Sequence, residues 1–145
     1  MNETDHADCV FCGIVVGTAP RHEVIADTPG ACAFMNANPA GFGHVLVIPK
    51  MHATDIWDLQ DRDAEAVWDL VRQIAAAAKR AFDLDGLNLF QANGRAGWQS
   101  VFHFHIHVVP RWEGDALIPN WTVPLGDRAT IPAAARRLRE GLQIV

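Results

Sequence analysis

The sequence predicts an α+β domain in which about five antiparallel strands form one sheet and a single long helix covers it. Short apolar segments recur between turn-forming residues, as strands do, and only the segment 61–82 carries a long apolar repeat of helical period. The 145 residues suit one domain with its own core. We expect residues 1–8 to be a flexible tail and 9–145 a single domain, with an extension to its core from about residue 116.

The N-terminal third is expected to hold a short helix and a hairpin. Residues 9–16 have helical spacing of apolar side chains and end at Gly17. Two strands, 22–26 and 31–35, flank the turn signal Asp27-Thr28-Pro29-Gly30.

The middle of the chain predicts a buried strand and the main helix. Residues 45–48 are continuously apolar, which is typical of a strand buried on both faces, and Pro49 ends them. The segment 61–82 has acidic residues in its first turn and basic residues in its last, as the helix dipole favours. Its apolar stripe is predicted to comprise Ala64, Val67, Trp68, Val71, Ile74, Ala75, Ala78 and Phe82.

The last third is expected to complete the sheet. A fourth strand at about 86–91 leads through a glycine-containing loop to a fifth at 102–109. A final helix, roughly 131–143, begins at Ile131-Pro132, where proline is tolerated in the first turn.

Composition and charge limit the function. Half of the residues are hydrophobic and a fifth are charged, which is ordinary for a globular protein. The net charge of −5, without a basic run, argues against a protein that coats nucleic acid. No apolar run approaches the roughly 20 residues of a membrane span, and the N-terminus lacks an apolar signal segment. We therefore expect a cytoplasmic protein with no nucleic-acid or membrane partner.

Three histidines at alternating positions, His103, His105 and His107, carry the main chemical signal. In a strand they line one face about 6.5–7 Å apart, and the residues between them face a core. A neutral imidazole can act as a nucleophile toward phosphorus, and a protonated one can stabilise charge or protonate a leaving group. The alternatives are exposed sheet residues without a catalytic role, or a zinc cluster.

The loop before this strand favours a phosphate ligand. Its glycines, Gly94 and Gly97, let backbone N–H groups approach an anion, and Gln99 and Ser100 add polar side chains.

Cys9 and Cys12 form a C-x-x-C pair, which indicates a metal or redox site in a chain without a disulfide framework. A structural zinc would need two further ligands. Spacing leaves the choice open among His6, His22, His44, His52 and the three alternating histidines. The alternative is a pair of unligated cysteines in a helical turn.

The motif His103-Phe104-His105-Ile106-His107-Val108-Val109 resembles the signature of the histidine triad (HIT) superfamily of nucleotide hydrolases and transferases. Two more stretches match, Gly43-His44-Val45-Leu46-Val47-Ile48-Pro49-Lys50 and Gln99-Ser100-Val101, so the similarity covers roughly residues 9–115. The small zinc-containing bacterial HIT proteins, near the Hint branch, look most similar. The resemblance implies a HIT-like fold, a five-stranded antiparallel sheet with one long helix, and a homodimer whose sheets join.

The resemblance also implies a mechanism. His105 would attack the α-phosphorus of a purine nucleotide and form a nucleotidyl-histidine intermediate, which water then resolves. A backbone carbonyl contact to its other ring nitrogen would fix the tautomer. His107 and His44 would hold phosphate oxygens and move protons, while Gln99 and Ser100 would bind the phosphate and the bridging atom. This scheme requires no metal for the chemistry.

The same resemblance implies further contacts. Asn36 would bind the ribose hydroxyls; the Hint branch usually has aspartate there and the Fhit branch asparagine. A structural zinc and a base pocket are implied as well. The zinc ligands would be Cys9, Cys12, His52 and His103, and the base pocket would be lined by Val10, Phe11, Ile14 and Phe34, which without the family are ordinary core residues.

Two positions depart from the family pattern. Ala92 stands where asparagine or glutamine is usual near the phosphate, and Asn93 is next to it, where a one-residue offset in a strand turns a side chain to the other face. Trp98 stands where glycine is common, so substrate choice could change there. A partner subunit's tryptophan reaches the site in Hint relatives, and Trp112 and Trp121 are the candidates in this chain.

The leading functional hypothesis is a hydrolase of purine nucleoside phosphoramidates or related adenylates. The rivals are a dinucleoside polyphosphate hydrolase, to which Asn36 points, and a nucleotide- or partner-binding dimer with incidental catalysis. Nucleotidyl transfer is disfavoured because the transferases replace the third triad histidine, here His107, with glutamine.

Overall fold

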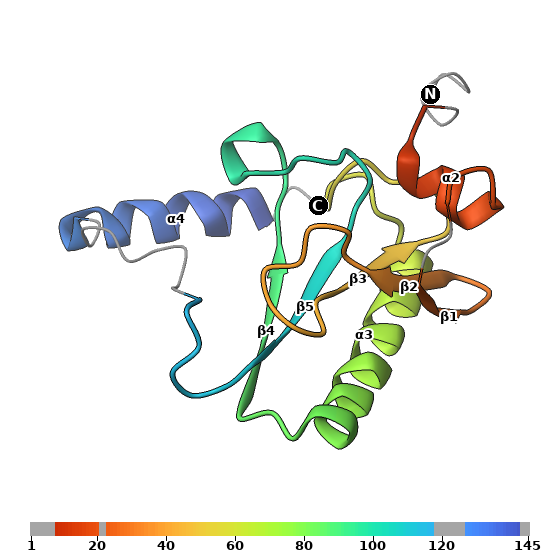
Figure 1. The fold of residues 1–145 in the computed structure, drawn as a ribbon. Helices are drawn as coiled ribbons and strands as arrows, with labels where there is room; N and C mark the ends of the chain where they lie inside the picture. Colours follow the sequence, from red (N-terminus) through yellow and green to blue (C-terminus); the bar gives the residue numbers. More distant parts are fainter. Residues whose placement is uncertain (1–7, 21–22, 118–126, 143–145) are drawn as a thin grey trace.

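A computed structural model describes residues 8–20, 23–117 and 127–142 and confirms the predicted fold class (Figure 1). The sheet has the order β1-β2-β3-β5-β4, and all neighbouring strands are antiparallel. In the described part of the chain three α-helices accompany it, and α3 lies along the sheet. The strands are β1 (Val24–Asp27), β2 (Ala31–Met35), β3 (Val45–Pro49), β4 (Gly86–Gln91) and β5 (Ile106–Arg111); the helices are α2 (Val10–Val16), α3 (Asp61–Phe82) and α4 (Ile131–Leu142).

The central strands are covered on both faces. Alternate residues of a strand point to opposite sides, so Ala33 and Val47 pack against α3 while Phe34 and Leu46 pack against α2. Every residue of β3 is buried, as its continuous apolar sequence predicts. The face toward α2 is the one that also carries the histidines.

Helix α3 has the predicted bounds, but one residue of its predicted stripe is wrong. Trp68 is 51 % exposed, whereas Leu70 is 2 % exposed. The buried arc is centred on Val67, Leu70, Val71 and Ile74, and a step of about 100° per residue carries position 68 off its edge. The prediction that Trp68 is buried rested on its hydrophobic character and was wrong.

The strand with the histidines begins later than predicted. β5 starts at Ile106 rather than at residue 102, because its ladder with β3 and β4 starts there, where Ile106 is opposite Val47 and Gln91. The residues before Ile106 form other hydrogen bonds than those of the strand ladder. The Phe104 N–H, for example, donates to the Ala53 carbonyl at 2.6 Å. The alternation of faces is nevertheless as predicted, because Phe104 and Ile106 lie in the core under α3.

Smaller boundary differences concern the other elements. β1 spans 24–27 rather than 22–26, with residues 21–22 outside the described part. β3 includes Pro49, which was expected to end it. Helix α4 ends at Leu142, and residue 143 lies beyond the described residues.

Helix α4 lies well away from α3 in Figure 1. None of its residues, all of which the structure describes, is buried. The apolar side chains of Ile131, Leu138 and Leu142 are exposed on it. Among the described residues, no helix combines the length and apolar character needed to cross a membrane.

Candidate active site and metal centre

Three imidazoles gather on the sheet face that α3 does not cover. The pairing of β3 with β5 places Leu46 opposite His107, which brings His44, just before β3, beside the histidine segment. The ring centroids of His44 and His107 lie 5.1 Å apart, and those of His105 and His107 lie 4.9 Å apart. The fold therefore unites a residue far away in the sequence with two of the alternating histidines.

His105 is held in one tautomer. Its Nδ1 lies 2.7 Å from the His103 carbonyl oxygen, which can only accept, so Nδ1 carries the proton and Nε2 keeps a lone pair. The side chain is 4 % exposed, and burial lowers the pKa of His105. A neutral imidazole with a free Nε2 lone pair is the form that can attack phosphorus.

A hydrogen-bond chain fixes the other two imidazoles. The Ala40 N–H donates to His44 Nδ1 at 2.9 Å, so the proton of a neutral His44 lies on Nε2. That N–H donates to His107 Nδ1 at 2.8 Å. A neutral His107 then carries its own proton on Nε2, which makes it a hydrogen-bond donor on the ring that packs against His105.

Burial and crowding keep these rings neutral. Burial and the neighbouring His105 and His44 lower the pKa of His107 to about 4. Burial also lowers the pKa of His44. At neutral pH the site therefore combines an unprotonated ring nitrogen with a neutral N–H donor.

The predicted phosphate loop uses its amides within the protein. Gln99 accepts from the Gly94 N–H at 2.8 Å and donates to the Thr54 carbonyl at 2.6 Å. Asn93 accepts from the Ile56 N–H at 2.8 Å. Both side chains thus connect loops that flank the site, and contact of either with a phosphate stays a prediction. Ser100, the other predicted phosphate ligand, is exposed at the surface.

The two positions that depart from the family pattern differ in setting. Trp98 is 64 % exposed and has φ +67°, in the left-handed region that favours glycine. Ala92 is buried.

The predicted ribose and base contacts lie beside the histidines. Asn36 accepts from the Asn38 N–H at 2.9 Å, and its Nδ2 lies 3.3 Å from His44 Nε2. Phe11 packs edge-on against Phe34, with ring centroids 5.3 Å apart. Three of the four predicted base-pocket residues, Phe11, Ile14 and Phe34, are buried in one core cluster, and Val10 is half exposed.

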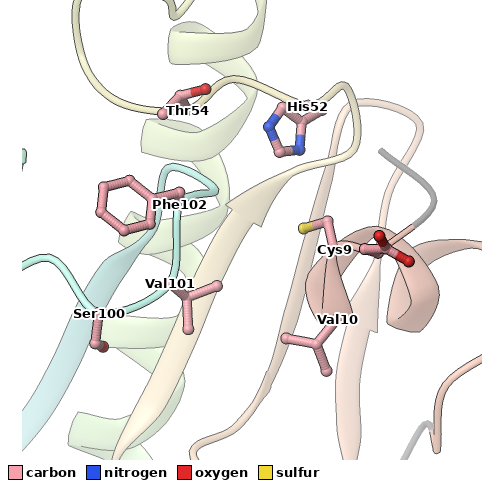
Figure 2. Close-up of a pocket in the computed structure, with 8 residues that line it drawn as sticks. Cys9, Val10, His52, Thr54, Ser100, Val101 and Phe102 are labelled. Carbon is pink, nitrogen blue, oxygen red and sulfur yellow. The ribbon is translucent and has the colours of Figure 1, made fainter. Parts of the chain in front are cut away.

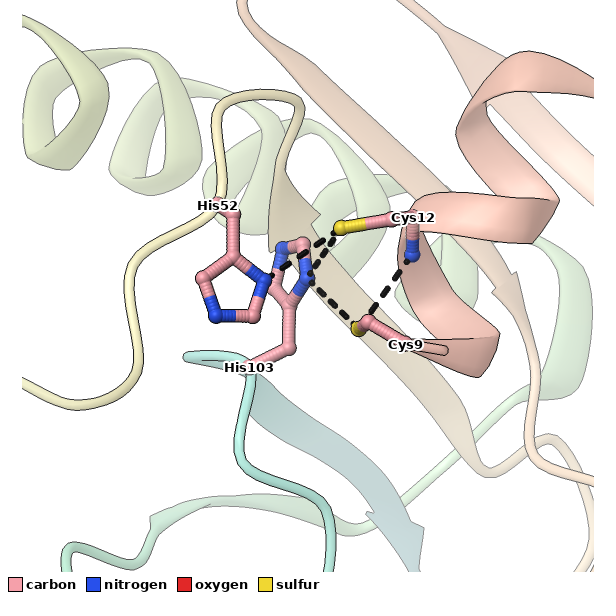
Figure 3. Close-up of side chains that lie close together, drawn as sticks. All are labelled: Cys9, Cys12, His52 and His103. Atoms are coloured by element: carbon pink, nitrogen blue, oxygen red, sulfur yellow. Dashed lines mark hydrogen bonds between the residues drawn. The ribbon is translucent and has the colours of Figure 1, made fainter. Parts of the chain in front are cut away.

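Four predicted metal ligands converge at the N-terminus of α2. Figure 3 shows His52 and His103 facing Cys9 and Cys12, and all four ligand atoms lie within 4.8 Å of one another. Sulfur-to-nitrogen distances are 3.3 Å for Cys12–His52 and 3.4 Å for Cys9–His103. Tetrahedral zinc with its usual bond lengths separates such atoms by about 3.6 Å. The cluster is compatible with zinc.

The surroundings of the cluster also suit a metal. His103 is fully buried, and its Nε2 lies 2.9 Å from the Pro49 carbonyl oxygen. That acceptor puts the ring proton on Nε2 and leaves the Nδ1 lone pair toward the sulfurs, the usual arrangement around a metal-binding histidine. Burial and the neighbouring Cys9 raise the pKa of Cys12 to about 12. A cation bound to the thiolate would lower this pKa again, because it stabilises the ionised form.

An open hollow of about 550 Å³ adjoins the cluster (Figure 2). Val10 and Val101 contribute apolar surface to it, while Ser100 and Thr54 contribute polar atoms. Cys9 and His52 also line it, so this side of the cluster is reached from solvent.

Several groups that shape the site could not be identified from the sequence. The Ala40 N–H and the Pro49 carbonyl are backbone groups, which any residue type supplies. Phe90 packs against His107 at 5.7 Å between ring centroids, and only the register of β4 with β5 reveals it. The candidates His6, His22 and Trp121 lie outside the described residues, and Trp112 packs near Phe42.

Sequence comparison finds relatives across most of the chain. A HIT-like protein of Mycoplasma genitalium is 39 % identical over 113 residues, which is 78 % of this chain and 79 % of the relative. The adenylylsulfatase HINT3 of Arabidopsis thaliana is 37 % identical over 110 residues, which is 76 % of this chain and 55 % of the relative.

Solved structures agree. A HIT family protein from Bacillus anthracis superposes with a TM-score of 0.82 at 31 % identity, covering 92 % of this chain and 96 % of the other. A zinc-bound histidine triad protein from Mycobacterium smegmatis gives 0.73 at 34 %, covering 94 % and 99 %. A histidine triad nucleotide-binding protein from Candida albicans gives 0.80 at 27 %, covering 94 % and 98 %.

The family model described as the HIT domain matches residues 18–114. This span includes the three alternating histidines, His44 and all five strands of the sheet, whereas Cys9 and Cys12 lie before it. The chain belongs to the HIT family.

Proposed function

We propose that the protein hydrolyses purine nucleoside phosphoramidates or related adenylates at the α-phosphorus through a nucleotidyl-histidine intermediate. Nε2 of His105 attacks phosphorus, and the leaving group departs with a proton. Water then attacks the phosphorus atom, its proton passes to His107, and the bond from phosphorus to Nε2 of His105 breaks, which releases the nucleoside monophosphate and restores the neutral imidazole. The covalent step divides one difficult displacement into two easier ones.

The observation that carries this proposal is the state of His105. The bond from its Nδ1 to the His103 carbonyl leaves Nε2 as a lone pair, and burial keeps the ring neutral. The Nε2–H of His107 can hydrogen-bond a phosphoryl oxygen or give a proton to the leaving group. We assign His44 the task of keeping His107 in that tautomer.

Relatives support an adenylate as substrate. One structural neighbour is described as a nucleotide-binding protein, and one sequence relative as an adenylylsulfatase. An adenylyl sulfate and an adenosine phosphoramidate differ only in the group that leaves from the α-phosphorus, so the same pair of histidines serves both. Adenylyl sulfate therefore belongs with the phosphoramidates in the test panel.

Substrate contacts follow from the neighbours of the histidines. We assign the ribose hydroxyls to Asn36 and the base to the apolar wall of Val10, Phe11, Ile14 and Phe34. Ser100 is assigned to the atom that bridges the nucleotide and its leaving group. Gln99 and Asn93 are assigned to holding the phosphate loop in shape as well as to the ligand, since Gln99 accepts from the Gly94 N–H and Asn93 accepts from the Ile56 N–H.

We also propose that Cys9, Cys12, His52 and His103 hold a structural zinc. When bound, the ion ties the N-terminus of α2 to the loop after β3 and to the histidine segment, and four protein ligands leave no open position for substrate. A zinc-bound family member among the structural neighbours supports this assignment. The protein is further proposed to be a homodimer, as the family resemblance implies, and to act in the cytoplasm, as expected from the composition of its sequence.

The test is a panel of adenosine phosphoramidate, acyl-adenylate, adenylyl sulfate and diadenosine polyphosphates, with mass spectrometry to trap nucleotidyl-His105. We expect turnover of a mononucleotide adenylate, a mass increase on the peptide that holds His105, and loss of both in His105→Asn. Fastest turnover of a diadenosine polyphosphate would favour the polyphosphate hydrolase instead. No turnover, with tight binding of AMP, would overturn hydrolysis and leave a binding protein.

A further inference from the structure

We propose that metal occupancy of the cluster of Cys9, Cys12, His52 and His103 sets the reactivity of His105, with His103 and Phe11 as the positioning residues. The inference rests on the proposed roles of His105 as nucleophile and of the cluster as a zinc site. The cluster and His105 are then coupled, because His103 and Phe11 connect the two sites.

The first link is His103, which belongs to both sites. Its side chain lies in the cluster, with Nδ1 at 3.4 Å from Cys9 Sγ and 3.5 Å from Cys12 Sγ. Its backbone carbonyl accepts the Nδ1–H of His105 at 2.7 Å. A metal that fixes the His103 ring therefore also fixes the oxygen that selects the reactive tautomer of His105.

The second link is Phe11, which lies between the two cysteines on α2. Its ring meets the His105 ring edge-on, with centroids 5.3 Å apart and planes at 87°, and lies 5.9 Å from the His103 ring. Helix α2 has seven residues, too few to be stable without tertiary contacts. The cysteines at its N-terminus anchor it, so the position of Phe11 against His105 depends on the cluster.

The cluster is separate from the main core and open to solvent. The core under α3 is built from the opposite face of the sheet, so loss of a metal leaves most buried apolar contacts in place. Cys9 and His52 line the hollow in Figure 2, which gives ions and chelators a route. The coupling is therefore expected to act in a folded protein, at a site that can exchange its ion.

The test compares zinc-loaded protein, chelator-treated protein and the variant His52→Ala. His52 is the ligand of choice because its ring contacts His103 and its Nδ1 lies 3.3 Å from Cys12 Sγ, while the substitution leaves His103, Phe11 and His105 themselves unchanged. The three readouts are the single-turnover rate of nucleotidyl-His105 formation, AMP affinity by calorimetry, and the His105 tautomer by ¹⁵N NMR of the ring. Circular dichroism verifies that each sample is folded.

We expect loss of the metal to slow nucleotidylation at least tenfold while AMP affinity changes less than threefold. The NMR spectrum should change from a single Nδ1–H tautomer to a mixture. An unchanged tautomer and a rate within twofold in folded, metal-free protein would overturn the coupling. Absence of any nucleotidyl-His105 in zinc-loaded protein would instead overturn the proposed function, and the NMR comparison would still decide the coupling.

If metal-free protein does not fold, zinc-loaded Phe11→Leu tests the second link directly. It should keep one zinc per chain and the single Nδ1–H tautomer, because the His103 carbonyl is unchanged, but lose rate at saturating substrate, because the His105 ring loses the contact that holds it. Val15→Ala is the matched control, because it shortens another apolar side chain of the same helix and has no assigned role in the site. A saturated rate within twofold of the wild type in Phe11→Leu would overturn the inference.

Discussion

The imidazole of His105 has two nitrogens in different environments, and that difference is the basis of its proposed reactivity. Nδ1 donates to a backbone carbonyl, and Nε2 is left with its lone pair. His107 is the complementary case, since it accepts at Nδ1 and presents an N–H at Nε2. Two chemically identical side chains, two residues apart, thus present a lone pair in one case and an N–H donor in the other through their hydrogen-bond partners alone.

The lowered pKa of His107 predicts how stability depends on pH. The unfolded chain binds a proton with a pKa near 6.5, and the folded protein with a pKa of about 4. The unfolded state therefore holds more protons between these values, and the free energy of unfolding should rise with pH from about 4 to 6.5 and level off above. Urea unfolding across this range measures it.

The matched variant for this prediction is His107→Gln, which removes one titrating group. Burial lowers the pKa of His44 and His105 as well, so the variant should keep a weaker dependence of the same sign. A variant with the same slope as the wild type between pH 4 and 6.5 would contradict the assignment to His107.

Trp98 predicts a second stability effect. At φ +67° a side chain costs about 1–2 kcal/mol, a penalty that glycine avoids. We expect Trp98→Gly to be more stable than Trp98→Ala by about 1 kcal/mol in urea unfolding. As a control, Ala96→Gly in the neighbouring turn, at ordinary φ, should lose about 0.5–1 kcal/mol. Equal free energies of unfolding for Trp98→Gly and Trp98→Ala would refute the inference of backbone strain at position 98.

At the scale of elements, the connection from β2 to β3 decides where His44 lies. Gly43 has φ +76°, and a Cβ there would lie 2.7 Å from Cε2 of Phe82 and 3.2 Å from Pro110. The loop therefore passes close over the end of α3 just before His44. That approach sets the position of the first histidine relative to β5.

Gly43→Ala should consequently destabilise the protein by about 2 kcal/mol or more, from the backbone conformation and the overlap together. Thermal or urea unfolding measures the change. Gly41→Ala is the control, because its Cβ would only touch Leu117 at an ordinary 3.7 Å. Similar losses for both variants would argue against a special role of Gly43.

Because two proposed zinc ligands lie at the N-terminus of α2, the free energy of unfolding is expected to depend on zinc. A metal that binds only the folded chain raises the free energy of unfolding by about 1.4 kcal/mol for each tenfold increase in free metal above its dissociation constant. We expect the urea midpoint to rise with buffered zinc and to fall with chelator. The double variant Cys9→Ser, Cys12→Ser should be insensitive, and a zinc-independent wild type would rule out the site.

At the scale of the whole molecule, the protein is a sheet with a core on each side and a helix, α4, that takes part in neither. Deletion of residues 128–145 is therefore expected to change the free energy of unfolding by less than about 1 kcal/mol, within the range of surface changes. Urea unfolding of the shortened chain checks this. A larger loss that depends on protein concentration would mean that α4 packs against a second copy instead.

Much of the fold and site follows from local patterns. The period of α3, the buried sequence of β3 and the alternation of the histidines depend on neighbouring residues, whose geometry is nearly fixed by the backbone. The same reasoning failed where position depends on distant partners. Trp68 is exposed because the sheet contacts a neighbouring arc of α3, and β5 begins at Ile106 because its strand partners begin there.

Residue type and spacing, which act over a few positions, are enough to specify the fold class, the family motifs and the face that His103, His105 and His107 share. Which nitrogen of each ring carries its proton depends on contacts that exist only in the folded chain. Those choices are made by the Ala40 N–H and by the carbonyls of Pro49 and His103. Backbone groups are the same in every residue, so no sequence records them, and they become specific only when the folded chain brings them to a side chain.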